Sequence, residues 1–288
     1  MEFSKLQAAG NDFILVDARN ADRDWAKLAQ IMSQRHFGVG ADGLILVQNS
    51  SYCDLKMRIF NPDGSEAETC GNGLRCLAKY AIEKGIVNTT DLRIETLSGM
   101  RQAKAYMLGS KVSRVEVSMG RPQFQPEQIP IILSTDAVAR EAKQSPIITY
   151  QLTADSYQLS VSLLSMGNPH AVSFVSKPVA SFPLNEIGPK VERHSLFPQR
   201  TNFEIARILS GEKIEARVWE RGVGETLACG SGACAIAVAA QLRNYVSDVV
   251  DIILPGGVLT ISWDRVGEVL LTGPVEEVFT GEYLAKGE

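Results

Sequence analysis

One pattern occurs twice in this chain and constrains its fold more than any other feature. Residues 66–76 read E-A-E-T-C-G-N-G-L-R-C, and residues 224–234 read G-E-T-L-A-C-G-S-G-A-C. In both, a cysteine, Cys70 or Cys229, precedes a Gly-polar-Gly turn and then an apolar run with helical spacing. We therefore expect each cysteine at the N-terminus of a helix, where unpaired N–H groups and the helix dipole favour an anion. Such a position would lower the pKa of a thiol and could also hold a carboxylate.

Positions upstream of the two cysteines also correspond, in the same order. Each of them lies in a turn or at the end of a strand pattern, such as M-R-I-F in the first half and A-R-V-W in the second. These correspondences predict two halves of common design, related by a pseudo-twofold axis, and a domain repeat is favoured over a solenoid. Turns that meet at a cleft between domains commonly build a ligand site. Asn61 matches Glu220 and Gly43 matches Asn202 at equal distances before the two cysteines, whereas the distances of Asn11 and Asn168 differ by two residues.

The length of 288 residues exceeds the usual size of one domain, so we expect two. Many short strand patterns, with one nearly all-apolar helix in each half, predict an α+β fold in which a curled, mostly antiparallel sheet surrounds a central helix. Two further helices are expected at 24–35 and 184–191. Residues 120–130, rich in proline and glutamine, are expected to be a linker. The domains would be 1–120 and 121–276, with a tail from about 277 to 288 joining the first.

Composition narrows the classes of partner. The net charge is −4 and no basic block occurs, which disfavours nucleic acid as a partner. The longest apolar runs are too short to span a bilayer, and the first residues do not resemble a signal peptide. Five cysteines form no dense framework, which favours a reducing cytoplasm over a secreted disulfide scaffold.

The polar residues also have structural interpretations. Cys70 and Cys229 could be buried core cysteines or a disulfide, but the repeated Gly-polar-Gly context favours function. Glu220 and Arg221 could be a solvated surface pair, yet their place between an apolar strand and a glycine-rich turn favours a cleft. His170 is either a turn residue or an auxiliary group of the site. The other cysteines, Cys53, Cys76 and Cys234, are expected in the core or in strands. His36 and His194 are expected to be structural or exposed, and the spacing predicts no metal site.

Two opposed thiols at helix N-termini suit a reaction that removes a proton from one face of a carbon and returns one to the other face. One sulfur acts as thiolate and the other as thiol, and these roles exchange with the stereochemistry of the substrate. Donors at both helix ends would stabilise charge that moves onto the α-carboxylate of an amino acid as its α-carbon flattens. The pair needs no cofactor, so the sequence predicts cofactor-independent racemisation or epimerisation.

The residues that carry this chemistry resemble the diaminopimelate epimerase family. The resemblance covers nearly the whole chain and implies two similar α+β domains with the active site between them. It also implies interconversion of LL- and meso-2,6-diaminopimelate, in the synthesis of lysine and of peptidoglycan precursors, by an isomerase that is often a homodimer. The matching segments are G-N-D-F at 10–13, N-P-D-G-S-E-A-E-T-C-G-N-G-L-R-C at 61–76, M-G-N-P-H at 166–170, E-R-G-V-G-E-T-L-A-C-G-S-G-A-C at 220–234 and P-G-G at 255–257.

The resemblance implies a role for each matching residue. Cys70 and Cys229 would be the acid–base pair. Backbone N–H groups of Gly71-Asn72 and Gly230-Ser231 would hold the α-carboxylate, while Glu220 and the Arg221 carbonyl would hold the reacting ammonium. One position departs from the family, because many bacterial members carry glutamine where this chain has Gly43. The distal end of the substrate would be held by Asn61, Asn168, Asn202 and the Arg221 side chain, with Asn11 nearby.

Four other functions compete with this interpretation. A proline-racemase-like enzyme would use the same cysteines, but its monocarboxylate substrate needs no distal polar cluster. Isomerases or cyclases of related fold usually lack the cysteine pair. A redox protein would need a resolving cysteine close by. A non-catalytic binding module would keep the asparagines and tolerate Cys70→Ser.

Overall fold

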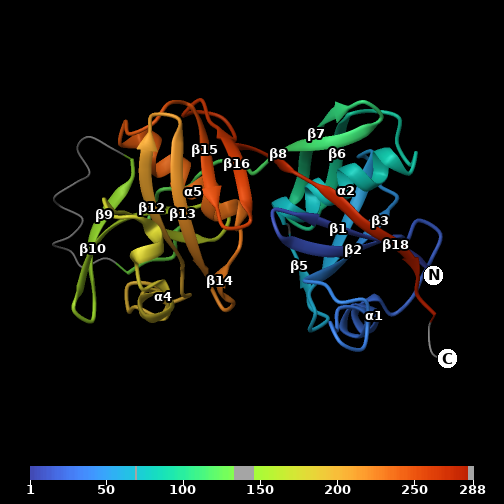
Figure 1. Ribbon diagram of the computed structural model, residues 1–288, viewed down its shortest axis with the longest axis horizontal. Coiled ribbons are helices and arrows are strands. Elements are labelled where there is room, and N and C mark those ends of the chain that lie inside the picture. The colour runs from blue at the N-terminus through green and yellow to red at the C-terminus, as the bar shows by residue number, and fades with distance from the viewer. Residues whose placement is uncertain (69, 133–145, 285–288) are drawn as a thin grey trace. The chain divides into compact units, whose positions relative to one another are not determined.

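The computed structural model describes residues 1–68, 70–132 and 146–284 (Figure 1). These residues divide into two compact units. Unit 1 comprises Met1–Ser118 together with the chain from Thr272 onward, and unit 2 comprises Met119–Leu271. Strands dominate both units, as the many short alternating patterns predict. The α+β architecture expected from the sequence is confirmed.

Unit 1 is a mixed, mainly antiparallel sheet. Strand β1 pairs antiparallel with both β18 and β2, and β2 then runs parallel to β3. Strand β3 is antiparallel to β4, β4 is parallel to β6, and β6, β7 and β8 follow as an antiparallel meander. The strands are β1 (Glu2–Ala8), β2 (Asn11–Asp17), β3 (Gly43–Gln48), β4 (Leu55–Phe60), β5 (Glu66–Ala67), β6 (Asp91–Thr96), β7 (Gly99–Leu108), β8 (Lys111–Ser118) and β18 (Glu276–Glu282).

Unit 2 repeats this order of parallel and antiparallel pairs. Strand β10 is antiparallel to β9 and β11, β11 is parallel to β12, β12 is antiparallel to β13, and β13 is parallel to β15. The strands are β9 (Ile148–Ala154), β10 (Tyr157–Ser165), β11 (Pro169–Phe174), β12 (Asn202–Ser210), β13 (Lys213–Glu220), β14 (Gly224–Thr226), β15 (Val249–Leu254) and β16 (Gly257–Ser262). Strand β17 (Leu270–Pro274) crosses the boundary between the units and pairs with β8.

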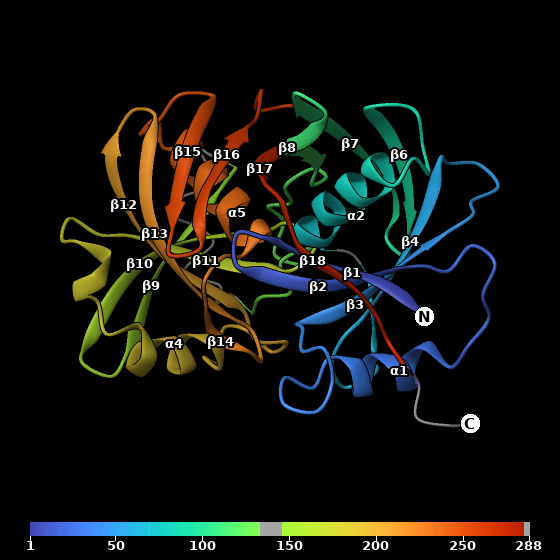
Figure 2. The same cartoon turned by 45° about the vertical axis from the view of Figure 1, so that its right-hand side comes forward.

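Each unit contains one long buried helix. In unit 1 this is α2 (Gly71–Glu83), which packs against β1, β2, β3, β4, β7 and β8. In unit 2 it is α5 (Gly230–Leu242), which packs against β10, β11, β12, β15 and β16 (Figure 2). Strands therefore contact each helix on several sides. Shorter helices precede β3 and β12 in the two units, namely α1 (Trp25–Met32) and α4 (Leu184–Glu192), with the 3₁₀ turn η1 (Val179–Ser181) before α4.

Strand register shows that the internal duplication is structural. Ile59 pairs with Ala67 in unit 1, and Val218 pairs with Thr226 in unit 2, at equal distances before the two cysteines. The same hairpins carry matching ion pairs, with Arg58 Nε 2.7 Å from Glu66 and Arg217 Nε 2.7 Å from Glu225. The two units thus share strand order, register and helix placement.

The chain that was expected to be a linker packs into unit 2. Gln123 forms an isolated bridge with Ser165, and Ile129 is fully buried in the main apolar cluster of that unit. Ile131 joins the same cluster. Proline and glutamine there reflect irregular structure held by the core, not a free connection. No helix among the described residues is long and apolar enough to cross a membrane.

Candidate functional site

Cys70 and Cys229 occupy the same structural position in the two units. Each is the N-cap residue of a 13-residue helix, in extended conformation with φ/ψ of −141°/119° and −117°/117°. Neither side chain caps its own helix. The carbonyls of Cys70 and Cys229 accept the first helical hydrogen bonds, from Leu74 N and Ala233 N, both at 2.9 Å. This confirms the predicted placement and leaves N–H groups of the first turn available to an anion.

The Cys70 thiol lies beside a network of side-chain amides. Its Sγ is 3.8 Å from Asn11 Oδ1, which also accepts a hydrogen bond from Asn72 Nδ2 at 3.1 Å. Asn72 is in turn fixed by the fully buried Arg75, whose Nη2 donates to Asn72 Oδ1 at 2.9 Å. A carboxamide oxygen therefore lies next to the Cys70 sulfur.

An ion-pair cluster fixes the other side of Asn11. Asn11 Nδ2 donates to Asp42 Oδ2 at 2.7 Å, and Arg35 bridges Asp42 and Asp12 at 2.7 and 3.0 Å. Burial alone would raise the pKa of Asp12, but hydrogen bonds from Arg35 and Lys5 lower it to about 2. The Asn11 amide is thus satisfied within unit 1, so it orients Cys70 and Asn72.

Cys229 has a different environment. It is only 5 % exposed, and its Sγ lies 3.4 Å from Ser231 Oγ. Burial raises the pKa of the Cys229 thiol well above its usual range, and the negative charges of Glu220 and Glu204 raise it further. Contacts with Ser231 and the Gly232 N–H act in the opposite direction without cancelling this effect. The expectation that the helix N-terminus lowers the pKa is therefore wrong for Cys229, because the effect of burial is larger than that of the helix end.

Glu220 is the last residue of β13 and Arg221 follows it, and local hydrogen bonds hold both residues. Glu220 Oε1 accepts from Thr226 Oγ1 at 2.6 Å, and the Arg221 N–H donates to Asn202 Oδ1 at 2.9 Å. Asn202 Nδ2 donates to the Pro169 carbonyl at 2.9 Å, and Asn202 is 2 % exposed. The oxygen and the NH₂ group of the Asn202 side chain are thus both hydrogen-bonded to the protein backbone, so Asn202 shapes the turn at Arg221. The Arg221 guanidinium is exposed.

Two buried polar groups, His170 and Glu204, support Asn168. His170 Nε2 is 2.9 Å from Asn168 Oδ1, and His170 Nδ1 is 2.6 Å from Glu204 Oε1. The side chains of His170 and Glu204 are both 0 % exposed. Burial raises the pKa of the Glu204 carboxyl, although His170 opposes this. Sequence analysis missed Glu204; the available signal was an acidic residue in the apolar strand pattern two residues after Asn202.

The remaining predicted residues lie on the same elements. Asn61 follows β4 and donates through Nδ2 to Ser65 Oγ at 2.9 Å. Gly71 and Gly230 begin α2 and α5. At Gly43, a Cβ would lie 2.8 Å from the Phe60 carbonyl oxygen, so a glutamine could not be placed there without a backbone shift. The local packing at this position therefore suits glycine.

The cysteines not assigned to the site are partly as predicted. Cys76 and Cys234 are fully buried on α2 and α5, which confirms them as core residues. Cys53 is half-buried in the bend before β4, so its expected place in the core or a strand was wrong. Ser50 lies three residues before Cys53, and its Oγ accepts a hydrogen bond from the Cys53 backbone N–H at 3.0 Å. This hydrogen bond fixes a turn at Cys53.

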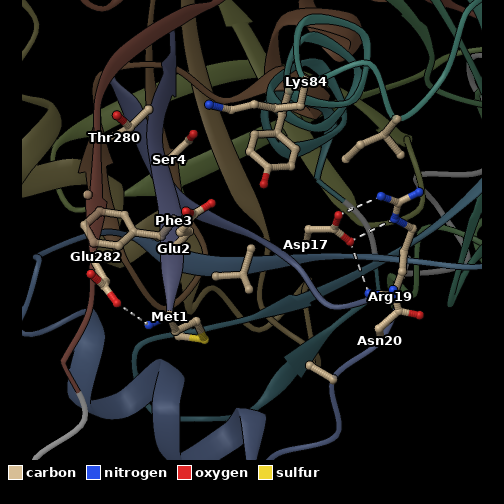
Figure 3. Close-up of a pocket in the computed structure, with 15 residues that line it drawn as sticks. Met1, Glu2, Phe3, Ser4, Asp17, Arg19, Asn20, Lys84, Thr280 and Glu282 are labelled. Carbon is tan, nitrogen blue, oxygen red and sulfur yellow. Dashed lines mark hydrogen bonds and ion pairs between the residues drawn. The ribbon is translucent and has the colours of Figure 1, made fainter.

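A cavity of about 660 Å³ in unit 1 is separate from Cys70 (Figure 3). Tyr80, from the last turns of α2, and Lys84, just after that helix, line it, whereas Cys70 precedes the first turn. Its charges are already paired: Arg19 contacts Asp17 at 2.8 Å, and the Met1 ammonium donates to the Tyr283 carbonyl at 2.9 Å. The cavity therefore adds nothing to the candidate site.

Comparison with known proteins identifies relatives over nearly the whole chain. The family model described as diaminopimelate epimerase matches residues 3–125 and 162–278. The diaminopimelate epimerase of Pelotomaculum thermopropionicum is 45 % identical over 286 residues, covering 98 % of this chain and 99 % of the relative. That of Methanococcus maripaludis is 41 % identical over 284 residues, with the same coverage of both chains.

Solved structures share the fold at low sequence identity. A PhzF-family phenazine biosynthesis protein of Bacillus anthracis has a TM-score of 0.67 at 16 % identity, covering 99 % of both chains. A hydroxyproline epimerase of Agrobacterium vitis, with bound trans-4-hydroxy-L-proline, has a TM-score of 0.63 at 13 % identity, covering 98 % of this chain and 90 % of that one. At such identities the likeness concerns the fold alone.

Proposed function

Because the chain belongs to the diaminopimelate epimerase family, we propose that it interconverts LL- and meso-2,6-diaminopimelate, as an isomerase that needs no cofactor. One observation carries the proposal. Cys70 and Cys229 have the same N-cap geometry in two units of common design. A two-base epimerisation needs two such groups, one for each face of the reacting carbon.

The proposed reaction begins with abstraction of the α-proton by one sulfur as thiolate. The other sulfur, as thiol, delivers its proton to the opposite face, which inverts the centre and exchanges the protonation states of the two cysteines. Cys70 faces the Asn11 carboxamide oxygen, whereas Cys229 faces the Ser231 hydroxyl, which can donate to a thiolate. The two sulfurs exchange the roles of thiolate and thiol with the stereochemistry of the substrate.

The first turns of α2 and α5 would hold the α-carboxylate at the reacting centre. The donors are the N–H groups of Gly71, Asn72, Gly230 and Ser231, which precede the intrahelical hydrogen-bonding pattern. These donors stabilise negative charge that moves onto the carboxylate as the α-carbon becomes planar. Glu220 and the Arg221 carbonyl, at the end of β13, would hold the reacting ammonium.

The distal end of diaminopimelate is a second amino-acid group, and it requires polar partners. We propose Asn61, Asn168 and the Arg221 side chain for this role, with Asn202 positioning Arg221 through its backbone. The exposed guanidinium of Arg221 can bind a carboxylate in two-pronged geometry. A substrate with one carboxylate, such as proline, would leave these groups without partners.

The cellular setting follows from the same proposal. Supplying meso-diaminopimelate serves lysine biosynthesis and peptidoglycan precursors, so we propose a cytoplasmic enzyme. We also propose a homodimer, as the family resemblance implies. Sedimentation of the purified protein tests the dimer without reference to activity.

The direct test of function is an assay on purified protein with no added cofactor. Incubation with LL-diaminopimelate should yield meso-diaminopimelate until the two approach equilibrium, as followed by chiral chromatography. L-Proline and trans-4-hydroxy-L-proline are the matched controls and should not be converted. Conversion of proline with no turnover of diaminopimelate would replace this proposal with a proline-racemase activity.

A further inference from the structure

A buried polar chain in unit 2 has no counterpart in unit 1. Strand register places His170 opposite Asn202 and Val172 opposite Glu204, as Phe13 lies opposite Gly43 and Leu15 opposite Ile45. His170 and Glu204 therefore stand where unit 1 has Phe13 and Ile45. Ile45 and Glu204 lie at equal distances before the two cysteines, whereas the distances of Phe13 and His170 differ by two residues.

The helices confirm this correspondence. A Cβ at Gly73 would lie 3.0 Å from the Ile45 side chain, and a Cβ at Gly232 would lie 3.1 Å from Glu204 Oε1. The same space under the first turn is thus apolar in unit 1 and holds a carboxyl group in unit 2. Because the fold forms with Phe13 and Ile45 in one unit, the polar pair of the other unit is not needed for folding.

Burying the polar pair of His170 and Glu204 costs free energy. Glu204 Oε2 is buried and has no hydrogen-bond partner among the described residues. A carboxylate beside a neutral imidazole would leave an uncompensated charge in this fully buried place. Two arrangements avoid both a net charge and an unpaired proton on Oε2: Glu204 is ionised and His170 protonated, or Glu204 is protonated on Oε1 and donates to Nδ1 of a neutral His170.

Both arrangements place a proton on His170 Nε2. In the ion pair both ring nitrogens carry hydrogen, and in the neutral pair Nδ1 accepts so that Nε2 must carry it. Nε2 is 2.9 Å from Asn168 Oδ1, so the ring donates and the amide oxygen accepts. The Asn168 NH₂ group then points away from His170, and it has no partner among the described residues.

We propose that Glu204 is a positioning residue that selects a carboxylate ligand at Asn168. By fixing the donor on His170 Nε2, Glu204 turns the Asn168 carboxamide so that its NH₂ group faces the substrate. A carboxylate accepts from that group, whereas an ammonium would need the amide oxygen. This inference rests on the proposed function, because the ligand concerned is the distal carboxylate of diaminopimelate.

The test combines kinetics with the protonation state of His170. Glu204→Leu removes the group that fixes the tautomer, and Glu204→Gln retains a polar partner for Nδ1. We expect Glu204→Leu to raise the KM for diaminopimelate by about tenfold or more and to change KM more than kcat, and Glu204→Gln to recover part of the loss in KM. Glu83→Gln is the control, because it removes a similarly enclosed carboxylate in unit 1, far from Asn168 in the chain.

Nitrogen NMR of ¹⁵N-histidine protein reads the tautomer directly, since the chain has three histidines and His170→Phe assigns the signal. The wild type should show a protonated Nε2, and Glu204→Leu should lose this fixed state. An unprotonated Nε2 in the wild type, or an unchanged KM in Glu204→Leu, would overturn the inference. If Glu204→Leu does not fold, the KM of Glu204→Gln and the histidine spectrum of the wild type still test the inference. Wild-type protein that does not turn over diaminopimelate would instead refute the proposed function, while the spectrum still tests the orientation of Asn168.

Discussion

The two helix N-termini share a backbone and differ in almost everything around it. Cys70 is half-buried beside carboxamides that are fixed by Arg75, whereas Cys229 is nearly buried beside the carboxyl groups of Glu220 and Glu204. The difference shows that a repeated unit can keep one backbone geometry at the N-terminus of its helix while the side chains around that N-terminus diverge.

The side chains that pack under the first turns of α2 and α5 also differ between the two units. Phe13 and Ile45 fill this layer with apolar groups in unit 1, while His170 and Glu204 fill it with a polar pair in unit 2. Unit 1 places its charges outside that layer, in the cluster of Lys5, Asp12 and Arg35. A substitution in one unit can therefore be compared with the matching position of the other unit, which stays unchanged.

The largest expected effect comes from removing either sulfur. Cys70→Ser and Cys229→Ser should each reduce epimerisation by about 10²–10⁴-fold, because a hydroxyl is a far weaker acid than a thiol and each face of the α-carbon needs its own group. Binding of diaminopimelate, measured by calorimetry, should largely persist. Cys53→Ser, in a bend outside the site, is the control and should retain normal turnover. Near-normal turnover in either of the first two variants would contradict the equivalence of the two N-caps.

Exchanging the buried layer should separate stability from binding. His170→Phe together with Glu204→Ile gives unit 2 the apolar pair of unit 1. The free energy of unfolding should stay unchanged or rise by about 1–4 kcal/mol, since a buried polar pair is often replaced by apolar groups without loss. The KM for diaminopimelate should rise by about tenfold. Urea unfolding and steady-state kinetics measure the two quantities, and a fall in stability with unchanged KM would show that the pair is structural.

Acid should affect unit 1 before unit 2. The pKa of Asp12 is lowered to about 2 in the folded protein, from 3.8, so its stabilisation is complete above about pH 5 and is lost as the pH falls toward 2. The loss amounts to about 2 kcal/mol. Unit 2 has Pro169 at the matching position. Hydrogen exchange by mass spectrometry between pH 5 and 2 should show unit 1 opening first, and Asp12→Asn should abolish the difference; earlier opening of unit 2 would contradict this.

The smallest effect concerns the paired hairpins. Arg58 contacts Glu66, and Arg217 contacts Glu225, but Arg217 Nη1 also donates to the carbonyls of Val179 and Phe182 at 2.9 Å. Arg217→Ala should therefore lower the free energy of unfolding by about 1–2 kcal/mol more than Arg58→Ala. If urea unfolding shows that both variants lose the same free energy of unfolding, the two carbonyls form hydrogen bonds with water once the guanidinium is removed.

Much of this organisation could be predicted from the sequence, because the strongest signals were local. A cysteine before Gly-polar-Gly and an apolar run predicts a helix N-cap, and both N-caps are confirmed. The gapless correspondence of Asn61 with Glu220 predicted strand ends that match in register. The family resemblance is also confirmed. The catalytic roles of the two cysteines and the substrate contacts stay predictions.

The remainder depends on contacts that the sequence does not reveal. Glu204 lies in an apolar strand pattern, and its contact with His170 depends on the parallel pairing of β11 with β12. The raised pKa of Cys229 results from burial, which outweighs the local effect of the helix end. The structural use of the Asn202 amide depends on where the Arg221 and Pro169 backbones lie. In each case the deciding neighbour is distant in the chain.

The central claim is that two sulfurs, one from each unit, act on opposite faces of one carbon, and incorporation of solvent deuterium tests it most directly. LL-Diaminopimelate is incubated with wild-type protein in heavy water without added cofactor, and substrate and product are separated early in the reaction. The account predicts deuterium at the inverted α-carbon of the product and almost none in recovered substrate. Equal deuterium in both, or product that retains the original hydrogen, would contradict it.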